Sequence, residues 1–452
     1  VYHVERRPGK RWALQHVTFW SDDEGVPCHR WIQTLNKHLL LTSLTCAADN
    51  VRPQRLLVFI NPVGGRCRGE EIYRCHVEPI FKLASINTHV VVTKQANHAK
   101  DYILNNNTEA FDGILSVGGD GTFNEVMHGV IEKAQNRVGV GETEGQLKPA
   151  TLRVGIIPAG STDCVCFTTI GTNDPVTAAL HVVIGDNQPL DVCEVRTDKA
   201  FLTFSVTLLG YGFYGDTLRD SENHRWLGPS RYDISGIKTF LRGASYTGRV
   251  DFRLATVDAT GPRDGKLCRS GVCGRFTAIN LSAMSSSCAR CPSGLSPAAH
   301  LASGSADLVL VRTCSRSALL RFLIRHTANQ DRFDFPFVET YRVSEVRFTP
   351  IAKGDCDECE EEDEYSIASN SELCRGLSPQ GATPNLCCCV SVPHTSTVSC
   401  WNCDGEILMQ TALNVRVRPR LIRLTSRHFL KLEIGRRANS ASSIHEHRDR
   451  AR

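Results

Sequence analysis

Residues 55–165 alternate between apolar runs and helix-like segments, and this alternation constrains the fold more than any other feature. The runs are LLVFI, THVVVT, GILSV and LRVGII. Runs that are apolar along their whole length are typical of strands buried on both faces, and strands that alternate with helices are typical of a parallel sheet. The sequence therefore predicts an α/β domain built on a parallel sheet.

The sequence outside this region has a different pattern of apolar and polar residues. From about residue 190 it favours β-strands, as in FLTFSVTLLGYGF, RFTAINLSAM and YRVSEVRFTP, and we expect a β-sandwich-like second domain. At the start of the chain, an alternating stretch and a helix at 29–41 resemble the last part of a pleckstrin-homology domain. Because the chain does not begin with Met, we interpret it as N-terminally truncated. A stray hairpin and helix packed on the next domain is the alternative.

These patterns divide the chain into six predicted segments. They are the pleckstrin-homology remnant (1–42), the catalytic α/β domain (54–190), the β-rich lipid-binding domain (191–352), a disordered acidic and Cys-rich insertion (353–396), strands that complete the kinase (397–434) and a flexible tail (435–452).

Composition excludes several classes of protein. With 41% hydrophobic and 22% charged residues the chain can bury a core, so it is not wholly disordered. Lys and Arg exceed Asp and Glu by only four (52 against 48), which argues against nucleic acid as the main partner. The apolar runs are shorter than the roughly 20 residues of a membrane-spanning helix. Twenty cysteines in a chain of 452 residues are too sparse for a disulfide scaffold, and we expect a reducing, cytoplasmic compartment.

The turn Gly118-Gly119-Asp120-Gly121-Thr122 follows one predicted strand and precedes a helix. Glycines allow backbone N–H groups to approach phosphate oxygens, and a helix N-terminus adds partial positive charge. An aspartate in such a cradle suits a general base that takes the proton of an attacking hydroxyl. The alternative is an ordinary turn in which Asp120 caps the helix.

Two further turns have the same position relative to their strands. Asn61-Pro62-Val63-Gly64-Gly65 follows the first strand, and a turn containing Gly160 follows the fourth. Each alone is an ordinary strand-to-helix connection, but three at one edge of a sheet indicate a nucleotide site. The Walker motif G-x-x-x-x-G-K-[ST] is absent, and so is G-x-G-x-x-G at these turns, which excludes a Walker-type NTPase and argues against a dinucleotide-binding fold.

The segments NPVGG, GGDGTFNEV and IPAGSTDCV together resemble the catalytic domain shared by diacylglycerol, sphingosine and ceramide kinases. Further segments, among them LLGYGFYGD, GLSPAAHL and WNCDGE, resemble the ceramide kinases within that family. The resemblance implies a phosphofructokinase-like α/β fold and an ATP-dependent lipid kinase that uses Mg²⁺ and phosphorylates the primary hydroxyl of ceramide. It also implies a cytoplasmic protein peripherally associated with the plasma membrane or Golgi.

The same resemblance implies roles for individual residues. Asp120 is the expected general base, Gly118, Gly119 and Gly121 border the lipid headgroup with it, and Asp216 holds the sphingoid amide or hydroxyl. The residues expected to contact ATP are Asn61, Pro62, Val63, Gly64, Gly65, Thr93, Glu125, Gly160, Asp404, Gly405 and Glu406.

Alternatives for several of these residues stay open. Glu125 is otherwise an exposed acid in the first helical turns, Asp216 a strand-end residue capping the next helix, and Asp404-Gly405 a hairpin turn. The last of these contacts ATP only if the C-terminal strand folds back beside the glycine turns.

The basic amphipathic segment 317–333 is a candidate for calmodulin binding, with core packing as its alternative. The spacing Cys268-RSGV-Cys273, followed by Cys288-AR-Cys291, departs from the C-x-x-x-C-x-x-C element of ceramide kinases, which puts a metal or redox role in doubt. No metal ligands are assigned. The competing functions are a related sphingoid or diacylglycerol kinase, NAD kinase or 6-phosphofructokinase, and a catalytically weak ceramide-kinase-like protein that binds membranes.

Overall fold

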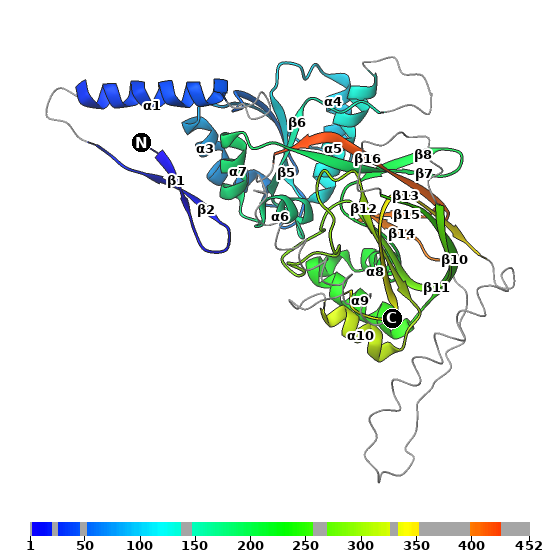
Figure 1. Ribbon diagram of the computed structural model, residues 1–452. Coiled ribbons are helices and arrows are strands. Elements are labelled where there is room, and N and C mark those ends of the chain that lie inside the picture. Colours follow the sequence, from blue (N-terminus) through cyan, green and yellow to red (C-terminus); the bar gives the residue numbers. More distant parts are fainter. Residues whose placement is uncertain are drawn as a thin grey trace, which may run out of the picture.

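The computed structural model describes residues 2–19, 26–45, 52–136, 147–255, 269–325, 333–351 and 398–425 (Figure 1). Its first half contains the expected parallel sheet, in the order β4-β3-β5-β6. The strands are β3 (Arg55–Ile60), β4 (Asn87–Val92), β5 (Gly113–Gly118) and β6 (Arg153–Pro158). The prediction of an α/β domain with a parallel sheet is therefore confirmed.

Helices cover both faces of this sheet, which is why β3, β5 and β6 are buried along almost their whole length. Figure 1 shows α4 and α5 on one side and α3, α6 and α7 on the other. The helical segments are α2 (Gly69–Ile72), η1 (Tyr73–Val77), α3 (Glu78–Leu83), α4 (His98–Asn105), α5 (Asp120–Asn136), α6 (Cys164–Ile170) and α7 (Pro175–Ile184).

The second half is rich in β-strands, also as expected. Its strands are β7 (Gln188–Arg196), β8 (Phe201–Ser205), β9 (Leu209–Gly212), β10 (Tyr246–Leu254), β11 (Arg269–Ser282), β12 (Ala306–Arg312), β13 (Val338–Pro350), β14 (Trp401–Cys403), β15 (Glu406–Leu408) and β16 (Leu413–Leu424). Both β11 and β13 pair with β10 along one half and with β12 along the other. The four strands therefore close into a ring around an apolar core that includes Tyr211, Phe348 and Trp401.

The long strand β16 connects the two halves. Its first residues pair with β13, and 414–418 and 422–424 pair with β7 on either side of a bulge. Arg423 and Leu424 also pair with Arg153 and Val154 at the edge of the parallel sheet. The predicted boundary at residue 190 falls inside β7, so the sheet continues across it. The division into domains at that residue stays a prediction.

Three α-helices and a 3₁₀ segment lie on one side of the second half, at the lower end of the molecule in Figure 1. They are α8 (Phe213–Glu222), η2 (Arg225–Ser230), α9 (Arg231–Arg242) and α10 (Arg316–Arg325). In α10, Leu319 and Phe322 are buried against Phe337, so one apolar face of the predicted calmodulin segment packs into the core. Residues 326–332 of that segment lie outside the described residues.

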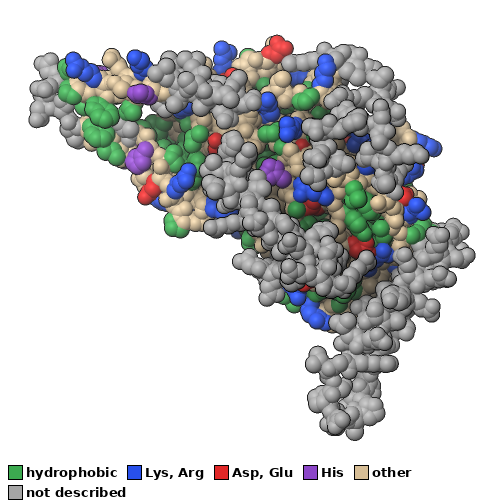
Figure 2. Space-filling model, in the orientation of Figure 1, with side chains coloured by type: hydrophobic (Ala, Val, Ile, Leu, Met, Phe, Trp, Pro, Cys, Tyr) green, Lys and Arg blue, Asp and Glu red, His purple; other side chains and the backbone are tan. Residues whose placement is uncertain are grey.

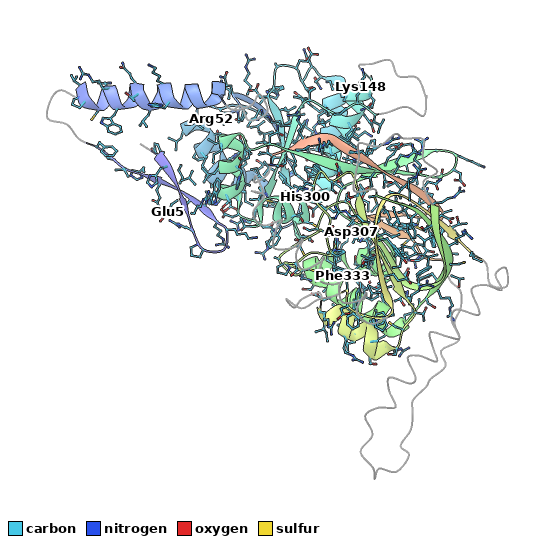
Figure 3. All side chains as sticks on the ribbon, viewed as in Figure 1. Glu5, Arg52, Lys148, His300, Asp307 and Phe333 are labelled. Carbon is cyan, nitrogen blue, oxygen red and sulfur yellow. The ribbon has the colours of Figure 1, made fainter. Side chains whose placement is uncertain are left out.

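The segment GLSPAAHL (294–301) crosses the junction between the two halves. The carboxylate of Asp307 accepts hydrogen bonds from Ser296 Oγ at 2.5 Å and from the backbone N–H of Ala298 at 2.6 Å. Asp191 in β7 donates its backbone N–H to the carbonyl of Leu301 at 2.6 Å. His300 and Asp307 are labelled at this junction in Figure 3. The segment therefore holds β12 to β7.

The N-terminal part forms a hairpin of β1 (Tyr2–Arg6) and β2 (Trp12–His16), followed by α1 (Val26–Thr45). The hairpin packs on α7. The ring of Trp12 stacks on His181 with centroids 4.0 Å apart, and the backbone N–H of Trp12 donates to Thr177 Oγ1 at 2.8 Å.

The predicted insertion 353–396, the predicted tail 435–452 and Cys268 lie outside the described residues. None of the helices that the structure describes combines the length and apolar character needed to cross a bilayer.

Candidate functional site

The three predicted glycine turns meet at the carboxyl edge of the parallel sheet, and their backbones touch. A Cβ on Gly65 would lie 2.5 Å from the carbonyl oxygen of Ala159, and a Cβ on Gly160 would lie 2.4 Å from the Cα of Gly119. Gly65 also has a φ of +59°, where a side chain is strained. Glycine is therefore required at the points where one turn crosses the next.

Asn61 shapes the first turn and fastens it to the second. Its Oδ1 accepts hydrogen bonds from the backbone N–H groups of Val63 and Gly64, both at 3.0 Å, and its Nδ2 donates to Thr122 Oγ1 at 3.0 Å. The side chain of Asn61 is thus occupied within the protein. What this turn offers a ligand is its exposed outer surface at Val63.

The second turn leads directly into α5, which begins at Asp120. Gly118 is packed, since a Cβ there would lie 2.5 Å from Thr122 Oγ1. Gly121 is exposed, and no heavy atom lies within 4 Å of the position its Cβ would take. The open side of this helix N-terminus, where backbone N–H groups carry partial positive charge, is therefore at Gly121.

The carboxylate of Asp120 bridges two helices. Its oxygens accept hydrogen bonds from the backbone N–H groups of Cys164, at 3.0 Å, and Val165, at 2.9 Å, in the first turn of α6. Burial raises the pKa of Asp120, and the charge of Asp404 raises it further, whereas the two N–H donors lower it. The predicted alternative, a capping role, is thus real, although the helix capped is α6 and not α5.

Asp163 is a further carboxylate at the site, and sequence reasoning did not select it. It ends the third turn with a φ of +51°, only 7% of its surface is exposed, and its Oδ1 accepts a hydrogen bond from Gly160 N–H at 2.9 Å. Burial, and then the charge of Asp120, raise the pKa of Asp163 to about 7. A signal was present, since an Asp directly before a helix is a typical cap, but Asp120 occupies that role.

The Asp404-Gly405-Glu406 segment forms the tight turn between β14 and β15. The carboxylate of Asp404 accepts five hydrogen bonds from the loop that joins β8 to β9. The donors are Ser205 Oγ, Val206 N, Thr207 N, Thr207 Oγ1 and Leu208 N, at 2.6–2.9 Å. Asp404 is therefore a residue of a hairpin turn, as the alternative predicted, and its buried carboxylate also fixes the conformation of this loop.

This turn nevertheless lies near the glycine turns. The charge of Asp404 contributes to the raised pKa of Asp120, and the charge of Glu406 contributes to the raised pKa of Glu125 after the larger effect of burial. Both contributions require proximity. The condition set from the sequence, that the C-terminal part of the chain returns to this edge of the sheet, is met by the geometry.

Glu125 and Thr93 stand at the end of the sheet near β4. Glu125 is half-buried, and its Oε2 accepts a hydrogen bond from the backbone N–H of Ala99 at 3.4 Å. Thr93 is buried and donates both its backbone N–H and its hydroxyl to the carbonyl of Ile60. Thr93 thus holds the segment after β4 against the first glycine turn.

Asp216 lies in the first turn of α8 and is 2% exposed. Its carboxylate accepts hydrogen bonds from Arg219 at 2.9 Å, from Ser399 Oγ at 2.8 Å and from the hydroxyl of Tyr246. It caps no helix. Ser399 stands five residues before Asp404, so the strand β14 leads from the Asp216 cluster to the glycine turns.

Each half of the described chain has a cavity. One of about 360 Å³ lies beside the third turn, and its lining includes Arg66, Arg68, Gly160, Asp163 and Asp174. The larger one, about 510 Å³, lies on β7, β10, β13 and β16 among paired arginines and carboxylates, and no predicted site residue lines it. The smaller cavity is therefore the one connected with the predicted site.

The metal question was left open by the sequence. Within the residues that the structure describes, no three His, Cys, Asp or Glu side chains are arranged to hold a metal ion. Cys288 and Cys291 pair through their backbones, each N–H donating to the other's carbonyl at 3.1 Å.

Comparison with known proteins agrees with this architecture. Residues 55–195 match the family described as diacylglycerol kinase catalytic domain, 207–435 the ceramide kinase C-terminal domain and 1–35 the ceramide kinase PH domain. The crystal structure of a diacylglycerol kinase from Bacillus anthracis str. Sterne superimposes on 84% of this chain and on 98% of its own length, with a TM-score of 0.51 at 11% identity. That likeness shows the fold.

Curated relatives are similar over most of the chain. Ceramide kinase from Homo sapiens is 46% identical over 94% of this chain and 82% of its own length, and ceramide kinase 1 from Caenorhabditis elegans is 31% identical over 77% and 67%. The human ceramide kinase-like protein is 29% identical over 88% and 72%.

The catalytic fold and the glycine turns thus define an ATP-dependent lipid kinase. Within that class, the chain belongs to the ceramide kinase family.

Proposed function

We propose that this protein transfers the γ-phosphoryl group of ATP to the primary hydroxyl of ceramide. The observation that carries the proposal is the meeting of three glycine turns around the carboxylate of Asp120, at the N-terminus of α5. Phosphoryl transfer needs a cradle for phosphate oxygens and a group that positions and deprotonates the hydroxyl. Family membership supplies the substrate class.

In this proposal the backbone of the glycine turns binds the phosphates. The exposed N-terminus of α5 at Gly121 and the turns that contain Gly65 and Gly160 offer backbone N–H groups to phosphate oxygens. Thr93, Glu125 and the 404–406 turn border the nucleotide. Asp404 acts through the loop it orders, because its carboxylate is already occupied by five donors.

Asp120 acts as the general base. The hydroxyl oxygen of the lipid forms a bond to the γ-phosphorus, the bond from that phosphorus to the bridging oxygen of ADP breaks, and the hydroxyl proton passes to Asp120. Burial, which raises the pKa of this carboxyl, makes it a better proton acceptor, while the N–H groups of Cys164 and Val165 hold it in place.

A divalent cation, which we propose to be Mg²⁺, would neutralise the charge that develops on the phosphates. Since no three carboxylate, His or Cys side chains converge among the described residues, we expect ATP to bring the ion. The phosphates and one or two carboxylates near Asp120 would then hold it, as is usual for Mg²⁺.

Asp216 is the proposed contact for the amide or secondary hydroxyl of the lipid. A buried carboxylate with three protein donors can exchange one of them for a ligand donor, and its two neutral donors, the hydroxyls of Ser399 and Tyr246, are the candidates for exchange. The apolar stretch GYGFYG, which directly precedes it in the sequence, suits a ligand with one polar end and long chains.

The partners follow from the same proposal. The match to a PH domain supports peripheral membrane association, and we propose the plasma membrane and Golgi as its location. Calmodulin binding at 317–333 stays a prediction. Because α10 buries Leu319 and Phe322, calmodulin binding would require the apolar face of α10 that contains them to leave the core.

A substrate panel tests the function. Dialysed protein is incubated with Mg-ATP and ceramide, sphingosine, diacylglycerol or NAD, and the phosphorylated product is measured. We expect ceramide to be preferred. Preference for sphingosine or diacylglycerol would identify a related lipid kinase, and phosphorylation of NAD would overturn the lipid assignment. No product from any lipid would favour the second candidate, a catalytically weak ceramide-kinase-like protein that binds membranes.

A further inference from the structure

The helix α9 exposes its aliphatic residues and fully buries only polar ones. Its buried residues are Ser235 and Thr239, whereas Ile234, Ile237 and Leu241 are 45%, 62% and 59% exposed. These three residues follow the i, i+3, i+7 spacing of one helix face. A surface helix of a globular protein normally buries its apolar face and exposes its polar one.

The fully buried residues of α9 are polar, and Phe240, which is partly buried, is the aromatic residue that packs inward. Ser235 Oγ donates to Asp220 at 2.8 Å, while the buried Thr239 Oγ1 has no hydrogen-bond partner within the described residues. The protein thus accepts a polar, incompletely satisfied contact under α9 and leaves an apolar stripe outside. Such an arrangement is costly unless the outer stripe is covered by something apolar.

The neighbouring helix extends the stripe. α10 exposes Leu320 and Ile324, at 45% and 56%, in addition to the apolar face that it buries. The two helices are adjacent, because Phe240 of α9 belongs to the same core cluster as α10 and the position of a Cβ on Gly243 lies 3.6 Å from the Arg316 guanidinium. Trp226, 80% exposed, precedes α9 in η2. We call these residues the α9–α10 face.

Positive charge surrounds this face. α9 and α10 carry six Arg or Lys residues and a single carboxylate, Asp233, which pairs with Arg290. Arg242, Arg316 and Arg321 are exposed, and in the described part of the chain none of them forms an ion pair with a carboxylate. Figure 2 shows Lys and Arg side chains at this lower end of the molecule, beside the position of α10 in Figure 1.

We propose that the α9–α10 face docks on the surface of an anionic lipid bilayer, with its apolar residues in the headgroup region. Apolar helix faces flanked by cations bind such surfaces through burial and through attraction to anionic lipids. A bilayer fits better than a protein partner because the substrate of a lipid kinase resides there, and on this point the inference rests on the proposed function. α9 packs on α8, which carries Asp216, so docking brings the proposed headgroup site to the membrane.

Vesicle binding by the full chain tests the proposal. Sedimentation with phosphatidylcholine vesicles, with and without phosphatidylserine, is measured for the wild type and for the double variant Ile237→Ser, Leu241→Ser. We expect the double variant to lose about tenfold or more in partition coefficient, because two exposed apolar side chains no longer enter the bilayer. The matched control is Leu83→Ser, which changes an exposed leucine on α3, 49% exposed, and should bind as the wild type does.

Further variants test the contribution of the cations and the depth at which the face enters the bilayer. Arg242→Gln with Arg321→Gln should lower binding to phosphatidylserine vesicles by about fivefold per cation and leave binding to neutral vesicles unchanged. Brominated lipids should quench Trp226, so Trp226→Phe should remove quenching that Trp31→Phe retains. Equal vesicle binding by the double variant and the wild type would overturn the proposal. So would a change from dimer to monomer in the double variant with vesicle binding intact, which would identify a second copy of this chain as the occupant.

Kinase activity distinguishes this inference from the proposed function. The double variant should phosphorylate a dispersed short-chain ceramide at the wild-type rate and act poorly on long-chain ceramide in vesicles. If the variants lose vesicle binding but the wild type phosphorylates no lipid, docking stands and the proposed function fails. If the wild type phosphorylates ceramide and the variants bind vesicles normally, the proposed function stands and the docking proposal fails.

Discussion

Asp120, the first residue of α5, accepts a hydrogen bond from the backbone N–H of Val165 at 2.9 Å, in the first turn of α6. A second bond from Cys164 makes the contact bidentate. The proposed base is thus also the cap of the following helix. Its substitution should therefore affect both catalysis and stability, and a test must separate the two.

We expect Asp120→Asn to lower kcat by about 10²–10⁴ and to leave ATP affinity within a few fold, because the amide keeps the size of the side chain but cannot take a proton. Since the amide offers one acceptor atom to two N–H donors, unfolding should also become easier by about 1 kcal/mol. Single-turnover kinetics, calorimetry with ATP and thermal melting measure the three quantities.

Asp112→Asn is the matched control for this variant. Asp112 Oδ2 likewise accepts two backbone N–H groups, those of Gln54 at 2.7 Å and Arg55 at 2.8 Å, at the opposite end of β3 from the glycine turns. Because one oxygen of Asp112 accepts both N–H groups, the amide oxygen of Asn can still accept both, so this variant should cost less stability than Asp120→Asn and should retain activity. If Asp120→Asn kept more than half of the wild-type kcat, Asp120 would be a capping residue alone.

The parallel sheet and its three turns were predictable because their signals are local. Continuous apolar runs such as Leu56–Ile60 can only be buried on both faces, and turns after parallel strands must share one edge. The strand-rich second half was also visible as a pattern of residues. These features depend on neighbours in the sequence, and the structure confirms the fold class.

What could not be predicted depends on contacts between distant segments. The pairing of Arg423 with Arg153, and the anchoring of Ser205–Leu208 by Asp404, join residues about 200 or more positions apart without any sequence pattern that marks the partner. The direction in which α9 faces was equally hidden, because the spacing of Ile234, Ile237 and Leu241 is the same whether the stripe points inward or outward.

We expect Gly121→Asp to weaken nucleotide binding without loss of folding. Gly121 has open space around its Cβ position, so the side chain fits, but its carboxylate would stand where phosphates are proposed to bind. Calorimetric titration with ATP should show at least about a tenfold loss, the effect of one unfavourable charge worth about 1.4 kcal/mol. Gly121→Ala is the control and should bind ATP and melt as the wild type does. Unchanged affinity in the aspartate variant would show that phosphates bind elsewhere.

The raised pKa of Asp163 predicts a pH dependence of stability. Its pKa is about 7 in the folded protein against an ordinary value of 3.8, so the folded state binds the proton more tightly than the unfolded state does. This proton stabilises the fold fully below about pH 4, and that stabilisation is lost as the pH rises to about 7.

At pH 8, Asp163→Asn should therefore have a higher melting temperature than the wild type. Its free energy of unfolding should be higher by at least about 1.4 kcal/mol, the equivalent of one pKa unit. The advantage should disappear towards pH 4, where both side chains are neutral. Asparagine retains an acceptor for Gly160 N–H and tolerates the positive φ, so little else changes. Melting curves between pH 4 and 8 measure the effect, and a difference that is constant across this range would contradict the assignment.

Asp216 should discriminate among lipid headgroups. Ceramide offers an amide N–H and a secondary hydroxyl near its reacting hydroxyl, whereas diacylglycerol offers only ester acceptors there. A site built around a buried acceptor rejects a ligand that leaves it unpaired. We expect Asp216→Asn to lower kcat/KM for ceramide by roughly tenfold to more than a hundredfold, the effect of losing a hydrogen bond to a charged group, and to leave ATP affinity unchanged.

Ser399→Ala is the control, because it removes one protein donor at 2.8 Å and keeps the carboxylate, so the preference for ceramide over diacylglycerol should persist. Rates with both lipids and the melting temperature are measured for each variant. An equal fall for both lipids in Asp216→Asn, together with a lower melting temperature, would mean that its bonds to Arg219 and Tyr246 serve the fold and that headgroup choice lies elsewhere.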